Sequence, residues 1–242
     1  MNDSGSLCPT IKASEIIGDK WTLLILRELM FGSTRYNQFQ RAVPRISPTV
    51  LSGRLKQMEA NGLLIHKKVA GQKGGEYRLT SSGLELAPIM DSLARWGLRW
   101  ARDQLCDIDL DVGSFMWDFH RTLEVAQLPD GKTVLCVIFG DLTEAQKWWL
   151  IADRAASGGR PSVDLCNEDP GLEVDVYVTS TLDALAATWM GDASLTEQLK
   201  TKNVILTGER QIVSSAQRWF PRSSYADVRP MENEEASQAS AP

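Results

Sequence analysis

The sequence predicts an α+β protein of two domains, and three observations support this. The chain has 242 residues, a length that suits two domains better than one. Residues 1–106 carry 15 Lys and Arg against 9 Asp and Glu, whereas residues 107–242 carry 11 against 22, so the two halves have opposite net charge. Helical patterns dominate the first half, and blocks of strands and helices alternate in the second, as is typical of α+β domains.

The composition is that of a globular protein and excludes several classes. No apolar run approaches the ~20 residues needed to cross a bilayer, and the N-terminus lacks the basic and apolar regions of a secretion signal. We therefore expect a cytoplasmic protein without membrane contact. The four cysteines (Cys8, Cys106, Cys136 and Cys166) form no CxxC pair and stand near neither histidine. This spacing predicts neither a metal site nor a structural disulfide in a reducing cytosol.

The first expected element is an amphipathic helix over Ile11–Met30. Its apolar residues recur at helical spacing, and Gly18 stands inside the pattern, so we expect a break or a kink there. Residues 31–34 supply a stop and a new N-cap. A short helix from Arg35 to about Ala42 follows, with Phe39 facing inward.

The next helix has clear ends. Ser47 is a good N-cap, Pro48 suits the first helical position, and Asn61-Gly62 ends the helix. One face carries the apolar residues Leu51, Leu55 and Met58. The opposite side carries small polar and basic residues, namely Thr49, Ser52, Gly53 and Lys56. Such a face suits a DNA major groove, because the backbone can approach closely while hydroxyls and Lys reach bases or phosphates.

A glycine in the middle of this helix needs a reason, because Gly53 costs ~1 kcal/mol relative to Ala. Close approach to DNA or to a neighbouring helix would justify it. Two strands follow, Leu63–Val69 and Glu76–Thr80, joined by a Gly-rich turn. A basic hairpin after two helices joined by a turn is the winged-helix arrangement, in which the hairpin reaches the DNA backbone or minor groove.

The last element of the first half is a helix over Ser82–Leu105 with an apolar stripe. Such a stripe packs either on its own domain or on a second protomer, and a dimer would bind a two-fold symmetric operator. This half resembles the HxlR-type winged-helix regulators of bacteria over roughly residues 8–102. The matching segments are Cys8-Pro9, Ile17–Arg27, Arg35–Phe39, Val50–Lys56, Asn61–Leu63, Glu76–Gly83 and Trp96-Gly97.

The resemblance implies a homodimer, formed by the first and last helices of this domain, that represses or activates nearby genes. Two features depart from the family: the hairpin lacks the expected prolines, and Gly53 stands where a longer side chain is usual. Some relatives of this family sense electrophiles or oxidants through a cysteine at the position of Cys8. The alternative is a small residue packed at a dimer interface, which we favour because the sequence shows no basic partner that would lower the thiol pKa.

We expect double-stranded DNA to be the main partner. The predicted contacts are Arg35, Ser47, Thr49, Ser52, Gly53, Arg54, Lys56, Lys67, Lys68 and Lys73. Ser47 offers its helix N-terminus to a phosphate. Arg54 lies beside the apolar seam, so it anchors either a phosphate or a neighbouring helix.

The second half is expected to be an α+β domain over residues 107–226, followed by a disordered acidic tail over residues 227–242. We expect helices over 113–127, 181–189, 194–201 and 209–219, and strands over 133–139, 147–152, 162–166, 173–178 and 203–206. This half resembles sterol-carrier-protein-like domains. The matching segments are Val174–Tyr177, Asp183–Leu185, Trp189–Asp192 and Leu199–Glu209. This resemblance implies a curved sheet covered by helices, with an apolar cavity for a hydrophobic molecule.

The inward candidates for that cavity are Phe115, Trp117, Phe119, Trp148, Trp189 and Met190; for each, the alternative is an ordinary core position. No nucleophile elbow, P-loop or GxGxxG motif occurs, so we predict no catalytic residue and no cofactor.

The leading hypothesis is a homodimeric DNA-binding regulator that binds an inverted-repeat operator and responds to a small hydrophobic effector in its C-terminal domain. One alternative is a C-terminal domain that docks a protein or stabilises the dimer without a ligand. Another is a lipid carrier that has acquired a DNA-binding domain.

Overall fold

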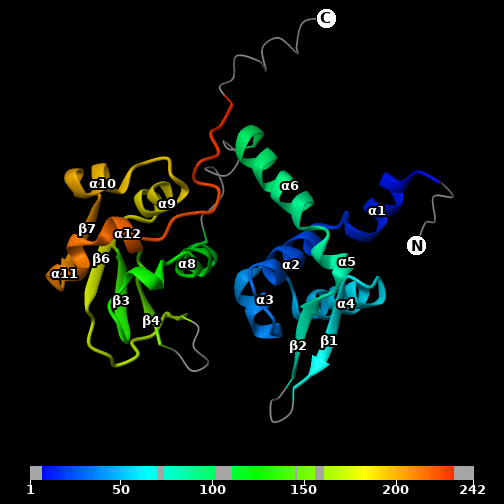
Figure 1. The fold of residues 1–242 in the computed structure, drawn as a ribbon, viewed down its shortest axis with the longest axis horizontal. Helices are drawn as coiled ribbons and strands as arrows, with labels where there is room; N and C mark the ends of the chain where they lie inside the picture. Colours follow the sequence, from blue (N-terminus) through cyan, green and yellow to red (C-terminus); the bar gives the residue numbers. More distant parts are fainter. Residues whose placement is uncertain (1–6, 70–73, 102–110, 145, 156–160, 232–242) are drawn as a thin grey trace, which may run out of the picture. The chain divides into compact units, whose positions relative to one another are not determined.

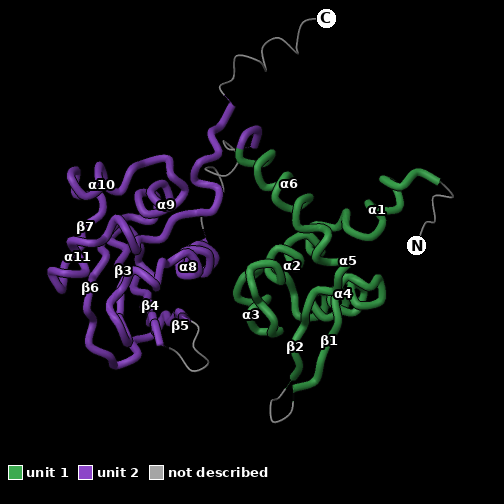
Figure 2. The backbone as a smooth tube through the Cα atoms, viewed as in Figure 1, with its two compact units in different colours: residues 1–98 green, residues 99–242 purple. Residues whose placement is uncertain are grey.

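The computed structural model describes residues 7–69, 74–101, 111–144, 146–155 and 161–231. The chain divides into two compact units, residues 1–98 and 99–242 (Figure 2), each with its own apolar core. The expected boundary at residue 106 lies outside the described residues. The division falls a little earlier, within the last helix expected for the first half.

The first unit is mostly helical, with one hairpin (Figure 1). Its elements are α1 (Pro9–Ile17), α2 (Lys20–Met30), α3 (Tyr36–Ala42), α4 (Pro48–Ala60), β1 (Leu64–Lys68), β2 (Gly75–Leu79), α5 (Ser81–Leu84) and α6 (Ala87–Trp100). The break expected at Gly18 is confirmed. The Asp19 carboxylate accepts hydrogen bonds from the backbone N–H groups of Trp21 and Thr22, so α2 begins as a new helix.

The single helix expected over Ser82–Leu105 was wrong in one respect, because the structure divides it into α5 and α6. The Thr80 hydroxyl caps α5 by accepting from the Gly83 backbone N–H. Pro88 then lies in the first turn of α6, where its missing N–H leaves no hydrogen bond unmade. Because α5 ends at Leu84, a new helix can begin at Ala87.

One core holds α2, α3, α4 and the hairpin together. Its most deeply buried side chains are Ile25, Leu26, Phe39, Leu51, Leu55, Met58 and Leu64. The hairpin is antiparallel and runs in register from Leu64 opposite Leu79 to Lys68 opposite Gly75. The Tyr77 backbone N–H donates to the Thr34 carbonyl at 2.8 Å, which ties β2 to the segment before α3.

The second unit is a five-stranded sheet with helices, so the predicted α+β class is confirmed. Its elements are α8 (Val112–Arg121), η1 (Val125–Gln127), β3 (Lys132–Phe139), β4 (Lys147–Asp153), β5 (Ser162–Cys166), β6 (Val176–Ser180), α9 (Leu182–Met190), α10 (Leu195–Thr201), β7 (Val204–Gly208), α11 (Arg210–Ser214) and α12 (Ala216–Trp219). The strand order is β5-β4-β3-β6-β7. β3 and β6 are parallel, and the other neighbouring pairs are antiparallel.

Alternate residues of the central strand β3 face opposite sides of this sheet. Leu135, Val137 and Phe139 join the main core, to which α8, α9, α11 and α12 contribute, whereas Val134 and Cys136 belong to a smaller cluster on the other side. The expected helix over 113–127 ends at Arg121. The Glu124 backbone N–H instead donates to the Trp219 carbonyl, because the chain turns there to meet α12.

Part of the expected tail is held against this unit. Arg229 donates to the Gly191 carbonyl at 3.1 Å, and the Val228 backbone N–H donates to the Tyr225 carbonyl at 2.9 Å. Gly191, at the end of α9, has a φ of +80°, and a Cβ there would collide with Ala226. Residues 227–231 are therefore ordered, and 232–242 lie outside the described residues. No described helix is long and apolar enough to cross a membrane.

Candidate nucleic-acid interface

The exposed face of α4 is built as its sequence pattern predicts. Leu51, Leu55 and Met58 are at most 1% exposed and anchor one side of the helix in the core. The other side presents the exposed residues Thr49, Ser52, Gly53 and Lys56, spaced i, i+3, i+4 and i+7. The Ser47 hydroxyl accepts from the Val50 backbone N–H at 3.3 Å and so caps the helix.

Gly53 lies at the centre of this face, and packing within the chain does not explain it. A Cβ built on Gly53 would meet no atom within 4 Å in the described part of the chain. Of the two reasons expected for this glycine, close approach of a neighbouring helix is therefore ruled out among the described residues. Close approach to DNA is the other reason that the sequence offered.

Arg54 anchors a neighbouring helix. Its guanidinium lies 3.0 Å from the carboxylate of Asp19, the residue that caps α2. The Arg54 side chain is 29% exposed, so the ion pair is partly shielded from water. The pair fixes α4 against the start of α2, which is one of the two roles left open by the sequence.

Tyr36 was not among the predicted site residues, although it shapes the interface. Its hydroxyl donates to the Pro48 carbonyl at 2.9 Å and lies 3.3 Å from the Ser52 hydroxyl oxygen. It therefore links α3 to the first turn of α4 and gives Ser52 a partner within the chain. The sequence did contain a signal for this role, because a Tyr in a short helix next to a polar helix offers a hydroxyl that can link the two helices.

The hairpin places further basic side chains in the same unit. Lys67 and Lys68 are exposed on β1, and Arg35 is exposed at the N-cap of α3, while Lys73 lies outside the described residues. The His66 backbone N–H donates to the Glu59 carboxylate at 3.0 Å, which ties the start of the hairpin to the end of α4. The predicted cations of the described hairpin thus stand on a strand that α4 itself positions.

Cys8 is exposed and directly precedes α1. Hydrogen bonds from the backbone N–H groups of Ile11 and Thr10 lower the pKa of its thiol. The sequence showed no basic side chain near this residue, and the start of the helix supplies backbone donors instead. A lower pKa raises the thiolate fraction near neutral pH, and the thiolate is the reactive form.

The aromatic residues predicted for an apolar cavity are mainly packed against one another. Phe115 and Phe119 are buried. The centroid of the Phe115 ring lies 5.4 Å from the ring centroid of Phe119 and 5.8 Å from that of Trp189. Trp148 also packs on this core, whereas Met190 is half-buried. The sequence missed two of the most deeply buried residues there, Met116 and Trp219.

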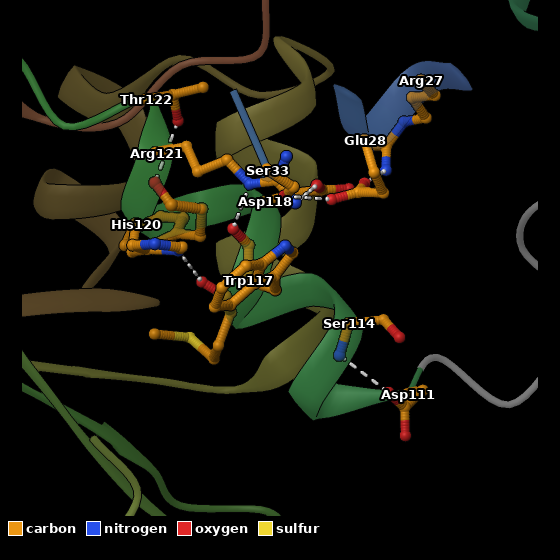
Figure 3. Close-up of polar contacts among 12 residues, drawn as sticks. Arg27, Glu28, Ser33, Asp111, Ser114, Trp117, Asp118, His120, Arg121 and Thr122 are labelled. Carbon is orange, nitrogen blue, oxygen red and sulfur yellow. Dashed lines mark hydrogen bonds and ion pairs between the residues drawn. The ribbon is translucent and has the colours of Figure 1, made fainter. Parts of the chain in front are cut away.

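Trp117 has different surroundings, next to His120 and Arg121 on α8 (Figure 3). Its ring lies 4.9 Å from that of His120 and 5.1 Å from the Arg121 guanidinium carbon. The Met116 carbonyl accepts from His120 Nδ1 at 3.2 Å. Burial, with a smaller effect from Arg121, lowers the pKa of His120 to about 4. Among the described residues, no group of three His, Cys, Asp or Glu could hold a metal ion.

Known proteins match the first half of the chain. The profile of the HxlR-like helix-turn-helix family matches residues 16–105. The uncharacterized HTH-type transcriptional regulator YvaP of Bacillus subtilis (strain 168) is 35% identical over 109 residues, which is 44% of this chain and 100% of YvaP. The uncharacterized HTH-type transcriptional regulator sll1512 of Synechocystis sp. (strain PCC 6803) is 30% identical over 114 residues, which is 46% of this chain and 83% of that protein.

Among solved structures, the redox regulator HypR in its oxidized form is 30% identical and has a TM-score of 0.36. The similarity covers 43% of this chain and 100% of that one. The two curated relatives are named as transcriptional regulators, which are not enzymes.

Proposed function

Because this chain belongs to the HxlR-like helix-turn-helix family, we propose that it binds an inverted-repeat DNA operator as a homodimer. Family membership makes it a transcriptional regulator of the helix-turn-helix type and not an enzyme. In the proposed complex, α4 enters the major groove, and the β1–β2 hairpin lies beside it over the backbone or minor groove. The protein acts where its DNA is, in the cytoplasm.

The observation that carries this proposal is the exposed face of α4. Small side chains at Thr49, Ser52 and Gly53 let the helix backbone come close to base edges, and Lys56 is long enough to reach a base or a phosphate. Open space above Gly53 leaves room for that approach. The proposed contacts are Arg35, Ser47, Thr49, Ser52, Gly53, Lys56, Lys67, Lys68 and Lys73, with Arg54 positioning α4 through Asp19.

The test is a fluorescence-anisotropy titration with DNA from upstream of the chain's own gene, against scrambled DNA, over a series of salt concentrations. We expect preferential binding with a steep negative salt slope. In the proposed complex Lys56 contacts a phosphate, so Lys56→Ala is expected to reduce the slope by about one unit. Lys200→Ala, an exposed lysine on α10 in the other unit, is the matched control. No binding even at low salt, or an equal loss in both variants, would contradict the proposal.

Gly53→Ala is expected to separate stability from binding. The added methyl group meets no atom in the described chain, so it should raise the free energy of unfolding by up to ~1 kcal/mol. In the complex the same methyl group faces DNA, and we expect about tenfold weaker operator binding, or ~1.4 kcal/mol. Urea unfolding and anisotropy measure the two effects.

The matched control for Gly53→Ala is Gly113→Ala, a helical glycine of the other unit. A Cβ at Gly113 would lie 3.5 Å from a carboxylate oxygen of Asp111, which is an ordinary contact. It should raise stability without changing DNA affinity. If Gly53→Ala binds operator as tightly as the unchanged protein, α4 does not approach DNA at this point.

Two exposed surfaces of the described residues, on α1 and α6, support the homodimer. None of the nine residues of α1 is buried, and an isolated helix this short is marginal in water. α6 exposes a stripe at i, i+4, i+7 and i+11, formed by Ile89, Leu93, Trp96 and Trp100, which are 45–59% exposed. Pairing α1 and α6 with a second copy would remove this apolar surface from water. Two-fold symmetry then requires an inverted repeat in the DNA.

We propose the second unit as a sterol-carrier-like sensing domain for a small hydrophobic effector. Its sheet, with helices packed on one face, and its aromatic core support this. The Phe115 and Trp189 rings are in contact. An effector that binds between these two rings therefore has to displace one of them. A second unit that yields no extractable lipid and binds no apolar dye would favour the alternative, in which this unit docks a protein or stabilises the dimer.

Redox sensing at Cys8, in the first unit, is a further proposal, supported by its lowered thiol pKa.

A further inference from the structure

A polar hollow with aromatic walls lies beside the hairpin, where the start of α3 meets β1 and the loop end of β2. Its volume is about 380 Å³. This lies within the range of small-molecule sites, ~300–1,000 Å³, and exceeds what an inorganic anion alone would fill. The lining residues are Arg35, Tyr36, Asn37, His66, Gly74, Gly75 and Tyr77.

The flat wall of the hollow is a pair of stacked rings. His66 and Tyr77 are directly opposite in the hairpin register, and their rings are 4.3 Å apart with only 11° between the planes. Phe39 meets the Tyr77 ring edge-on at 5.9 Å, so the core supports the wall from behind. Gly75 leaves room for the His66 ring, because a Cβ there would collide with that ring. Such a surface favours another planar ring stacked upon it.

The polar side of the hollow comes from α3. Arg35 is the N-cap residue, and its backbone N–H donates to the Gln38 side chain at 2.9 Å, which holds the residue at the start of the helix. Arg35 presents a planar fork of donors that matches a carboxylate, and Asn37 adds an amide. The Glu59 carboxylate accepts from the backbone N–H of the lining residue His66 at 3.0 Å.

We propose that this hollow binds a small planar aromatic carboxylate. The carboxylate lies on Arg35 and Asn37, and the ring lies on the His66–Tyr77 stack. The ligand would compete with DNA, because Arg35 is also a proposed DNA contact; this consequence rests on the proposed function, whereas the binding itself does not. The inference places an effector site in the DNA-binding unit, in addition to the one proposed for the second unit.

The chain has two histidines, and this makes the test direct. The full-length protein is labelled with ¹³C-histidine and titrated with benzoate in the absence of DNA. The His66 ring signals should shift saturably, whereas those of His120, buried in the other unit, should not. Cyclohexanecarboxylate has the same charge without the aromatic ring, and benzamide has the ring without the charge. Each should bind about tenfold more weakly than benzoate.

Two arginine variants with the same change of charge complete the test. Arg35→Gln should weaken benzoate binding about tenfold, whereas Arg45→Gln, an exposed arginine outside the hollow, should leave it unchanged. Shifts of His120 alone would place the ligand in the second unit and overturn the inference. A His66 response to inorganic phosphate as strong as that to benzoate would also overturn it, because it would indicate a simple anion site.

The DNA titration distinguishes the two possible failures. If operator DNA binds and His66 does not respond to benzoate, the inference fails and the proposed function stands. If His66 responds and no DNA binds, the site stands and the proposed function fails. Where both hold, saturating benzoate should weaken operator binding by about tenfold or more, as expected for loss of one charge-assisted contact.

Discussion

Trp96→Glu is expected to convert the homodimer into a monomer and to weaken operator binding about 100-fold or more. Trp96 is 59% exposed in the middle of the α6 stripe, so in the proposed dimer it lies near the centre of the interface, where a buried carboxylate without a partner is strongly unfavourable. A monomer binds one half-site at a time. It loses the gain of ~10²–10⁴ that linked binding sites provide.

Sedimentation analysis measures the oligomeric state, and the anisotropy titration measures the affinity. Leu172→Glu is the matched control, because Leu172 is a 43% exposed leucine in the second unit and belongs to neither α1 nor α6. The Trp96→Phe variant should remain a dimer, since it keeps an aromatic ring at this position. A monomeric unchanged protein that binds its operator tightly would contradict the proposed assembly, as would a Trp96→Glu variant that is still a dimer.

Acidification is expected to destabilise the second unit through His120. Its pKa is lowered from 6.5 to about 4, first by burial and then by the Arg121 charge. Above pH 6.5 the imidazole is neutral in both the folded and the unfolded state, so it has no effect on stability there. As the pH falls from 6.5 to 4, only the unfolded state binds the proton. The free energy of unfolding should therefore fall by about 3 kcal/mol over this range.

Urea unfolding at several pH values between neutrality and pH 4 measures this loss. His120→Gln does not titrate in this range, so its curve should lack this part of the pH dependence. His66→Gln is the matched control, because His66 is exposed. If the unchanged protein and His120→Gln lose stability equally on acidification, the buried imidazole is not the cause.

Local signals in the sequence were sufficient to predict α4. Ser47 and Pro48 mark its start, and Leu51, Leu55 and Met58 mark the side that the core buries. These features depend on capping groups and periodicities within a few residues, which is the range over which a sequence reports reliably on structure.

The same local signals predicted the exposed residues of α4, but not the contacts that hold α4 in place. The ion pair of Arg54 with Asp19 and the hydrogen bond of Tyr36 to Pro48 join residues far apart along the chain. The sequence left Arg54 with two roles and assigned Tyr36 none. Packing around the core brings Arg54 to Asp19 and the Tyr36 hydroxyl to the Pro48 carbonyl.

The sequence by itself therefore determined the two-unit α+β organisation, the polar face of α4 and the break at Gly18. Tertiary structure alone decided the hollow beneath the His66–Tyr77 stack and the lowered pKa of His120. The physical reason is the same in each case. Caps and hydrophobic periodicity act between near neighbours along the chain, whereas burial, ring stacking and hydrogen bonding of a particular atom depend on how the folded backbone places groups in space.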